Sequence, residues 1–353
     1  LMGGLASVLL AAPSLAFTPT IGTIQPRGGP RGTEMTIRLG GDRLFEPQEI
    51  LFYQPGITVT SLEKVGDQHK AVKATITIAP DAPLGEHVLR LRCKGGVTYQ
   101  RSFWVGQYPT VMEKRSEDGS RDLNSNFNEP QEISINQTVQ GVADREDADY
   151  YLLQCRKGQR LSVEVEGMRL GRTLFDPYVA ILNKDRFELA SSDDTALLFR
   201  DCAASIVVPE DGPYTVLVRE SSYQGTGACQ YRLHVGEFPR PTAVYPPGVR
   251  PGDSLEFTFV GDPTGDLVSK LEVPRERQSF RAFIRNGEWF APSGIPVRIS
   301  PLPYHNEVEP NEGGKEATPA EAPPVPVAFH GILSKKEDKD WFRFAAKKGQ
   351  KLR

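Results

Sequence analysis

The stretch EDADYYLLQCRKGQRL, residues 146–161, returns later in the chain as EDKDWFRFAAKKGQKLR, residues 337–353. Both copies place acidic residues before a pair of aromatic residues, continue with alternating residues, and reach Lys-Gly-Gln, a basic residue and leucine. Alternation between turn residues is typical of a β-strand with one buried face. The stretch therefore predicts a strand between two polar turns, and its recurrence predicts a module that occurs twice.

A second pair of stretches repeats without gaps. These are PTIGTIQPRGGPRGTEMTIRLGGD, residues 19–42, and PRPTAVYPPGVRPGDSLEFTFVGD, residues 239–262. The shared positions are Pro26, Gly28, Gly32, Gly41 and Asp42, which recur as Pro246, Gly248, Gly252, Gly261 and Asp262. Glycine and proline mark turns, and the alternating residues after Gly32 and Gly252 indicate strands. We therefore expect two copies of a two-module unit, the second of them incomplete.

The composition fits an all-β protein built of tandem β-sandwich modules. The 353 residues include 33 glycines and 29 prolines, which interrupt helices and occupy turns, and the sequence shows no convincing capped amphipathic helix. We predict these segments: a signal peptide, truncated at its start, over 1–16; a sandwich over 18–107; a linker over 108–127; a sandwich over 128–236; a second, divergent copy of the first sandwich over 237–304; an acidic Pro- and Ala-rich linker over 305–328; and the start of a second copy of the other sandwich over 329–353.

The first residues and the overall charge suggest where the protein works. LASVLLAAPSLA, residues 5–16, is a short apolar run that closes on a small-x-small pattern, as in a signal peptide whose basic start is missing. The alternative is a buried first strand. The run is too short to cross a bilayer, and no transmembrane segment is predicted. The net charge of −3 gives no basic stripe for nucleic acid. We expect an exported protein that is periplasmic, attached to the cell surface or released.

Export permits disulfides. The four cysteines are Cys93, Cys155, Cys202 and Cys229, and none lies in a CxxC motif. Cys202 and Cys229 each begin a predicted strand of the same module, so we expect them to form a disulfide. Four cysteines allow three full pairings, and the alternative is four unpaired thiols.

Module 18–107 resembles the IPT/TIG immunoglobulin-like domains, through Pro19-x-Ile-x-x-Ile-x-Pro26, Gly32-Thr33 and the late stretch APLGEHVLRLRCKGGVTYQRSFWV. Module 128–236 resembles the jelly-roll-like bacterial pre-peptidase C-terminal (PPC) domain. The residues that carry this second resemblance are Gly141, Asp147-x-Asp149-Tyr150-Tyr151, Lys157-Gly158-Gln159, Asp176-Pro177, LASSDDT and PEDGPYTVLV. The whole arrangement resembles the large exported proteins of planctomycete-type bacteria.

The resemblance implies a non-catalytic role. PPC domains accompany secreted peptidases, and some relatives, the collagen-binding domains of clostridial collagenases, bind calcium and an extracellular polymer. We expect an adhesion, spacer or binding protein that contacts an extracellular polymer, either protein or polysaccharide. The alternative is an accessory region of a secreted peptidase or other hydrolase whose catalytic domain lies outside these residues.

The sharpest candidate site is a calcium site. HNEVEPNE, residues 305–312, places Glu307, Glu309 and Asn311 at alternate positions, which point the same way on an extended segment. The resemblance implies that acids just before the aromatic pair, here Asp338 and Asp340, complete the site. Calcium takes about six to eight hard oxygen ligands, which carboxylates and an Asn carbonyl supply. The alternative is an acidic, solvated linker followed by a polar turn.

The first copy departs from this pattern. Its linker SRDLNSNFNEPQ, residues 120–131, matches only at Asp122 and Asn124, with Ser120 where the first glutamate would stand. Asp147 and Asp149 remain before the aromatic pair. We expect calcium to bind more weakly to Asp122, Asn124, Asp147 and Asp149, because fewer full charges are present.

Nothing in the sequence predicts catalysis in these residues. The chain has no HExxH pair for zinc and no GxSxG elbow for a serine nucleophile. His234 lies in YRLHV, where we expect it to pack against neighbouring strands. Asp193 and Asp194, in the loop SSDDT, are expected to form a turn.

The aromatic pairs carry a last prediction. Tyr150-Tyr151 and Trp341-Phe342 occupy matching positions. Adjacent residues of a strand face opposite sides, so one ring of each pair is expected in the core and the other outward. An outward ring can stack on a polymer or a sugar, and the alternative is ordinary packing between sheets.

Overall fold

The computed structural model describes residues 18–118, 121–276 and 279–352. In these residues the regular structure is almost entirely β, and one short 3-10 helix, η1 (Met168–Leu170), interrupts it. The prediction of an all-β fold is confirmed. None of the described residues forms an apolar helix with the length needed to cross a bilayer. The segment 1–16, predicted as a signal peptide, lies outside the described residues.

The chain divides into two compact units, one ending at Gln107 and including residues 170–172, the other containing the remaining residues. The strands of the first unit are β1 (Thr20–Gln25), β2 (Gly28–Pro30), β3 (Thr33–Asp42), β4 (Pro47–Phe52), β5 (Ile57–Lys64), β6 (Ala71–Ile78), β7 (Gly85–Cys93), β8 (Gly96–Val97) and β9 (Arg101–Gly106). They form two sheets, with orders β1-β3-β6-β5 and β2-β9-β7-β4, and β8 pairs with β7.

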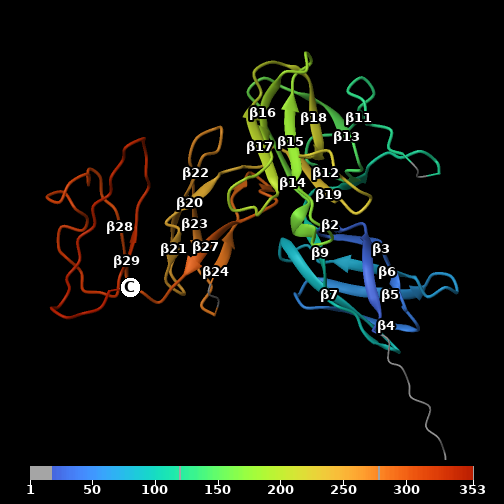
Figure 1. Ribbon diagram of the computed structural model, residues 1–353, viewed down its shortest axis with the longest axis horizontal. Coiled ribbons are helices and arrows are strands. Elements are labelled where there is room, and N and C mark those ends of the chain that lie inside the picture. Colours follow the sequence, from blue (N-terminus) through green and yellow to red (C-terminus); the bar gives the residue numbers. More distant parts are fainter. Residues whose placement is uncertain (1–17, 119–120, 277–278, 353) are drawn as a thin grey trace, which may run out of the picture. The chain divides into compact units, whose positions relative to one another are not determined.

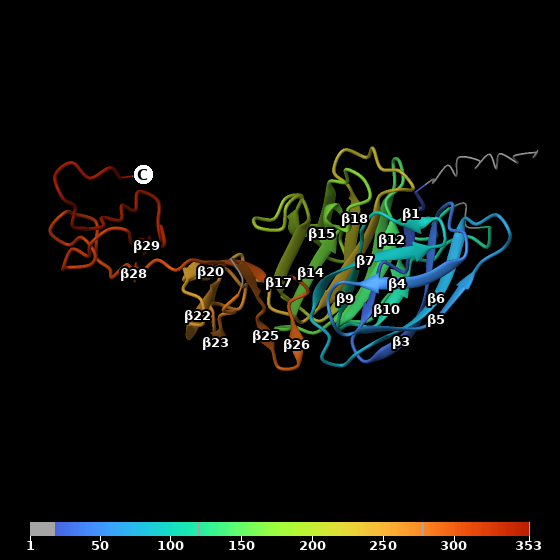
Figure 2. The same ribbon diagram turned by 90° about the horizontal axis from the view of Figure 1, so that it is seen from below.

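One core lies between these two sheets (Figures 1 and 2). Ile37 and Ile76 come from one sheet, Leu89 and Phe103 come from the other, and all four are fully buried. Their neighbours along each strand are more exposed, as the alternating sequence predicts. Gly32, in the turn directly before β3, has φ +70°, a conformation that glycine adopts without steric cost. The first unit is therefore a β-sandwich whose strands pair mostly antiparallel, with β2 and β9 parallel.

The second unit begins with a larger sandwich. Its strands are β10 (Thr110–Met112), β11 (Gln131–Glu132), β12 (Gln137–Val142), β13 (Ala148–Cys155), β14 (Arg160–Glu166), β15 (Pro177–Leu182), β16 (Glu188–Ser192), β17 (Cys202–Val207), β18 (Gly212–Glu220) and β19 (Gln230–Gly236). The sheet orders are β10-β12-β19-β14-β17 and β11-β13-β18-β15-β16. Residues of both sheets, among them Tyr151, Val163, Val216 and Leu233, share one buried core.

A smaller sandwich follows in the same unit. Its strands are β20 (Ala243–Tyr245), β21 (Gly248–Val249), β22 (Ser254–Val260), β23 (Leu267–Glu272), β24 (Ser279–Ala282) and β27 (Ile295–Ile299), with the hairpin β25 (Arg285–Asn286) and β26 (Trp289–Phe290). β20-β22-β23 and β21-β27-β24 enclose a core around Phe257, Phe259 and Val297. The remaining strands, β28 (Tyr304–Asn306) and β29 (Ala328–His330), pair in parallel.

The sequence repeat appears as a repeat of register. Gln25 of β1 pairs with Arg38 of β3, and Tyr245 of β20 pairs with Thr258 of β22, so both partners lie the same distance apart in the chain. The parallel pairing of β2 with β9 likewise recurs between β21 and β27. The second copy is smaller: its two main sheets have three strands each, where the first copy has a four-stranded and a five-stranded sheet.

The expected disulfide is not formed. Cys202 and Cys229 are both buried free thiols, as are Cys93 and Cys155. Cys202 lies on β17, Cys229 directly precedes β19, and β14 separates these two strands in the sheet. Two strand spacings amount to about 9.5 Å, whereas a disulfide requires Cα atoms within about 7 Å. The sequence places both cysteines at strand starts but does not show that a strand lies between them.

Candidate metal centre

In each of the two linkers a short strand pairs in parallel with a strand that follows it in the chain. β10 pairs in parallel with β12, and β28 pairs in parallel with β29. A glutamate follows each linker strand: the backbone N–H of Glu113 donates to Gln140 O at 2.9 Å, and that of Glu307 donates to His330 O at 2.8 Å. Glu113 and Glu307 therefore occupy equivalent positions in the two copies.

The first acidic cluster gathers around Glu113. Carboxylate oxygens of Glu113, Asp122 and Asp149 all lie within 4.8 Å of one another. Asn124 and Asp149 are fully buried, and neither the Asn124 amide nor Asp149 Oδ1 finds a hydrogen-bond partner among the described residues. Asp147 lies beside Asp122, where the two carboxyl groups interact. The cluster thus combines carboxylates with buried polar atoms that lack partners.

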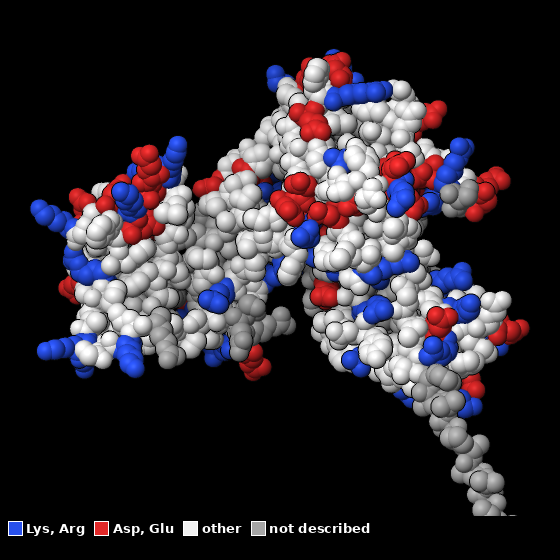
Figure 3. All heavy atoms as spheres, in the orientation of Figure 1, with Lys and Arg blue, Asp and Glu red and all other residues white. Residues whose placement is uncertain are grey.

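The second acidic cluster has the same plan. Oxygens of Glu307, Glu309 and Asp340 lie within 4.8 Å of one another. Asn311 is fully buried, and its Oδ1 has no hydrogen-bond partner in the described part of the chain. Asp338 accepts from the backbone of Ser334 at 2.6 Å, while its Oδ1 has no partner there. Figure 3 shows acidic side chains, in red, gathered on this C-terminal segment.

Backbone contacts confirm which residues correspond. The N–H of Tyr150 donates to Asn124 O at 2.9 Å, and the N–H of Trp341 donates to Asn311 O at 3.0 Å. Asn124 and Asn311 are therefore equivalent. By the same register Asp122 matches Glu309, Asp147 matches Asp338, and Asp149 matches Asp340.

The electrostatics of both clusters favour a cation. Burial, together with the charge of Glu113, raises the pKa of Asp149 well above its ordinary value. Burial and the neighbouring Asp122 raise the pKa of Asp147 to about 7, and burial and Asp340 raise the pKa of Glu307. Carboxylates held side by side resist ionisation unless a positive charge joins them. In the first cluster Arg115 supplies one such charge, 3.5 Å from Glu113 Oε2, whereas in the second Glu307 and Asp340 are only partly buried and Glu309 is exposed. A hard cation bound between them would relieve this cost.

Two glycines leave room for the clusters. A Cβ atom at Gly331 would lie 2.6 Å from both Asp340 Oδ2 and Glu307 Oε2, so a side chain there would occupy the space between the ligands. A Cβ atom at Gly141 would lie 2.4 Å from the ring of Tyr231. The hydroxyl of Tyr231 donates to Asp149 Oδ2 at 2.6 Å. Gly141 therefore makes room for the tyrosine that positions a ligand of the first cluster.

The structure brings together Asp122, Asp147 and Asp149 of the first copy, and Glu307, Glu309, Asn311 and Asp340 of the second, and it adds Glu113. The carboxylate of Asp338 instead accepts from Ser334. Sequence comparison placed Ser120, which lies outside the described residues, at the position of the first glutamate. This assignment is wrong, because residues 114–121 form a longer connection between Glu113 and Asp122 where the second copy has only Val308. One sequence signal could have identified Glu113: a proline, Pro109 or Pro303, lies four residues before the glutamate of each copy. In the structure the carbonyl oxygen of each proline accepts a hydrogen bond from a backbone N–H of the neighbouring strand.

The other residues that the sequence analysis considered lie outside the two acidic clusters. Asp193 and Asp194 lie in the loop after β16, outside both clusters. His234 is buried on β19, where its Nδ1 lies 2.8 Å from Thr138 Oγ1. Tyr151 is fully buried in the core and Tyr150 is partly exposed on the opposite face of β13, as the alternation predicts. Trp341 is 51% exposed.

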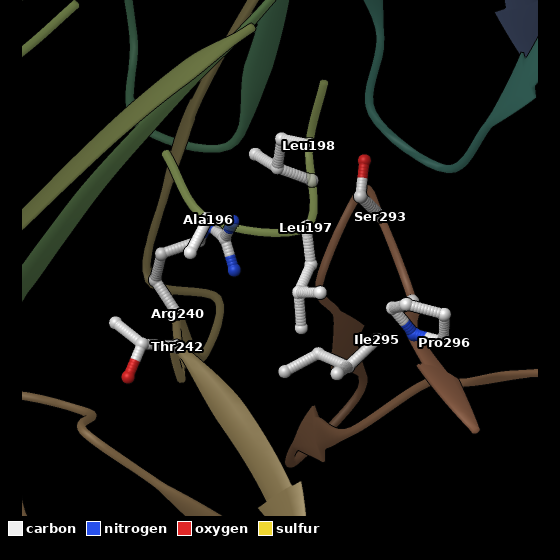
Figure 4. Close-up of a pocket in the computed structure, with 9 residues that line it drawn as sticks. Ala196, Leu197, Leu198, Arg240, Thr242, Ser293, Ile295 and Pro296 are labelled. Atoms are coloured by element: carbon white, nitrogen blue, oxygen red, sulfur yellow. The ribbon is translucent and has the colours of Figure 1, made fainter. Parts of the chain in front are cut away.

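One hollow near these elements is not a binding site. Figure 4 shows Leu197 and Leu198 opposite Ser293, Ile295 and Pro296, with Arg240 and Thr242 beside them. The hollow has no room even for a water molecule. The guanidinium of Arg240 is already engaged by Glu164, 3.2 Å away. The arrangement is packing within the second unit.

The chain matches no protein-family model and no curated protein. Among solved structures it is similar to the pre-peptidase C-terminal domain of a collagenase from Bacillus anthracis, with a TM-score of 0.24 and 14% identity over 30% of this chain and 94% of that one. It is also similar to PliG of Aeromonas hydrophila, a periplasmic inhibitor of g-type lysozyme (TM-score 0.21, 10% identity, 30% and 96% covered). A third is SGBP-B from a xyloglucan utilization locus of Bacteroides uniformis (TM-score 0.23, 10% identity, 62% and 73% covered). Such distant likenesses carry no argument about function, and membership of the PPC family stays a prediction.

Proposed function

We propose that the two acidic clusters bind calcium and that the chain is a non-catalytic, exported binding or spacer protein whose module junctions calcium stiffens. One observation carries this proposal. Each linker brings a glutamate and a second acidic residue, Asp122 or Glu309, within 4.8 Å of an aspartate that precedes the aromatic pair. A buried asparagine, Asn124 or Asn311, follows two residues later, and Gly331 lies beside the second set, where a side chain would fill the space.

The donor set fits calcium by its chemistry. All of the side chains in both clusters offer oxygen, the donor that calcium and magnesium prefer, and none offers sulfur or imidazole. Calcium accepts irregular arrangements of about six to eight oxygens at 2.3–2.6 Å, whereas magnesium demands a near-ideal octahedron. The clusters are irregular and mix side chains from a linker and a strand, so they favour calcium. Millimolar calcium outside cells suits weak sites of this kind.

The ion would connect two parts of the chain. Glu307, Glu309 and Asn311 follow the linker strand β28, whereas Asp340 directly precedes the aromatic pair of the module that follows. A cation held by both sets fixes the direction in which the linker enters that module. The first copy has the same arrangement. Its linker carries Glu113, Asp122 and Asn124, and Asp149 directly precedes the aromatic pair of the module that follows. Without the ion, repulsion between the carboxylates opposes this closure.

The same junctions would serve an accessory region of a secreted peptidase or other hydrolase. That alternative differs from a surface binding or spacer protein in one observable feature, a catalytic domain in the same polypeptide. Sequencing the complete reading frame distinguishes them.

Thermal unfolding of the whole chain in calcium and in chelator tests the calcium sites. Saturation at about 100 times the Kd adds about 2.7 kcal/mol, which raises the midpoint of a module of this size by about 10 °C. Gly331→Ala and Asp340→Asn should each remove the part of the shift that belongs to the second cluster. Gly22→Ala is the matched control, because its Cβ would meet its nearest neighbour at an ordinary 3.8 Å. An unchanged midpoint in millimolar calcium would refute the proposal.

A further inference from the structure

The outer face of the sheet β11-β13-β18-β15-β16 carries an ordered group of aromatic and arginine side chains. Across the sheet, Tyr150 lies opposite Leu217, while Arg219 lies opposite Tyr178. Residues opposite one another on neighbouring strands share a face. This face is the one that does not contribute to the main core, and we call it the arginine–tyrosine face, made of Phe127, Tyr150, Tyr178, Arg186, Arg219 and Tyr223.

Arg219 is fixed between two tyrosines. Its guanidinium carbon lies 4.1 Å from the ring centroid of Tyr178 and 4.4 Å from that of Tyr223. Its NH1 group donates to Glu220 O at 3.1 Å and to Ser221 O at 2.6 Å. The plane of the guanidinium is therefore held while its other N–H groups remain for a ligand.

Arg186 is held in a similar way at the other part of the face. Its guanidinium carbon lies 4.3 Å from the ring centroid of Phe127, and NH2 donates to Asn128 Oδ1 at 2.8 Å. The Phe127 ring meets Tyr150 edge to face at 5.9 Å. Burial raises the pKa of the Tyr150 hydroxyl, and the charges of Arg186 and Arg219 oppose that rise, so both guanidinium groups lie near it.

Neither arginine is neutralised by an ion pair. Among the described residues, Arg186 and Arg219 have no carboxylate within 4.0 Å. Beneath the rings, Ala180, Leu182 and Leu217 form a small buried cluster that supports them. The face thus presents two fixed, unpaired guanidinium groups next to partly exposed rings, of which Tyr223 is 44% exposed.

We infer that the arginine–tyrosine face binds an acidic polysaccharide, with sugar rings packed on Tyr150 and Tyr223 and their carboxylates bound by Arg186 and Arg219. This inference rests on the proposed function, since it names the extracellular polymer. A planar guanidinium matches a carboxylate through paired N–H donors. A uronic acid carries that carboxylate on a rigid ring with an apolar C–H surface, which suits a tyrosine beside a fixed arginine.

An acidic polypeptide fits this face less well. Its carboxylates stand on flexible side chains that lose rotamer freedom on binding, whereas a rigid sugar ring is already ordered. The charge also argues against a neutral glucan as the main ligand, because such a polymer carries no carboxylate to pair with the guanidinium groups of Arg186 and Arg219. The occupant is therefore identified by both features together, a ring surface and a carboxylate.

The test is the retention of the whole chain by polygalacturonate in calcium-free buffer, since this polymer itself binds calcium. Arg186→Ala with Arg219→Ala should weaken binding by about 10- to 30-fold or more, the loss expected of a central contact. Arg219→Lys keeps the charge but loses the planar stack, and should weaken binding nearly as much as Arg219→Ala. Arg156→Ala is the matched control, because Arg156 is exposed on the same module outside this face.

Three outcomes would overturn the inference: equal retention by neutral dextran, retention by poly-glutamate but not by polygalacturonate, or an equal loss from Arg156→Ala. Calcium uptake separates this inference from the proposed function. A wild-type chain that takes up calcium but is not retained refutes the acidic polysaccharide alone. A chain that takes up no calcium refutes the calcium junctions, whatever the polymer result.

Discussion

Asp149 is the best single residue for testing the first acidic cluster. It is fully buried beside Glu113 and Asp122, and Tyr231 holds one of its oxygens at 2.6 Å. Asp149→Asn removes one negative charge with almost no change of shape. A divalent ion about 2.4 Å from a carboxylate oxygen loses at least about 3 kcal/mol when that charge is removed, even at the dielectric constant of bulk water. The affinity of this site should therefore fall by about 100-fold.

Calorimetric titration of calcium into chelator-treated protein measures this effect. The measurement belongs at pH 8, above the pKa of about 7 to which burial and Asp122 raise Asp147, so that Asp147 is ionised at the start of the titration. Wild-type protein should bind two calcium ions. Asp149→Asn and Asp340→Asn should each leave one.

The control is Asp67→Asn, which removes an exposed carboxylate paired with Lys64 at 3.2 Å and should leave both sites intact. If Asp149→Asn and Asp67→Asn gave the same titration, the assignment of Asp149 as a ligand would be refuted. Wild-type protein that bound no calcium would refute the reasoning for both clusters.

Three further predictions concern the interior of the second unit. Glu164→Gln should lower the free energy of unfolding by about 3–5 kcal/mol in denaturant titrations, because Arg240 at 3.2 Å would lose its buried counter-charge and Arg169 at 3.1 Å would lose one of two, keeping Asp201; a loss below 1 kcal/mol would contradict this. Burial alone would raise the pKa of Glu166, but Arg232 and His234 outweigh it and hold this pKa below the ordinary value. Glu166 therefore contributes stability that is present above its unfolded pKa of about 4.3 and is lost as pH falls below it; denaturant midpoints should drop between pH 5 and pH 3, and by less in Glu166→Gln. All four cysteines should react with a thiol reagent after unfolding without reductant, and should resist it in the native state, since each is a buried free thiol. Labelling of only two cysteines in the unfolded chain would show that the other two form a disulfide.

The strands and the repeat follow from the sequence itself. Alternating residues between turns predicted β3, β13 and β22, because the period of a strand is a local property of the chain. The ungapped repeat predicted a second, divergent copy of the first module, and the structure shows β20 and β22 in the register of β1 and β3. The module boundaries proposed from the sequence stay predictions.

The second acidic cluster was largely predictable for the same reason. Glu307, Glu309 and Asn311 lie within five consecutive residues, so an extended backbone places them on one side. Glu113 could not be predicted in this way, because the connection from Glu113 to Asp122 is longer than the one from Glu307 to Glu309. Only the pairing of β10 with β12 shows where Glu113 lies. The aromatic–arginine contacts depend likewise on which strands become neighbours.

What the sequence by itself determined about this protein is its all-β character, its repeat and the short-range part of its acidic site. The tertiary structure alone decided which polar faces are buried. Glu164 and Glu166 alternate with Val163 and Val165 along β14, a pattern that predicts a solvated polar face, yet both glutamates are fully buried among arginines. Local periodicity fixes the side of a strand on which a residue lies, whereas contacts between distant segments determine whether that side meets water, a neighbouring charge or a cation.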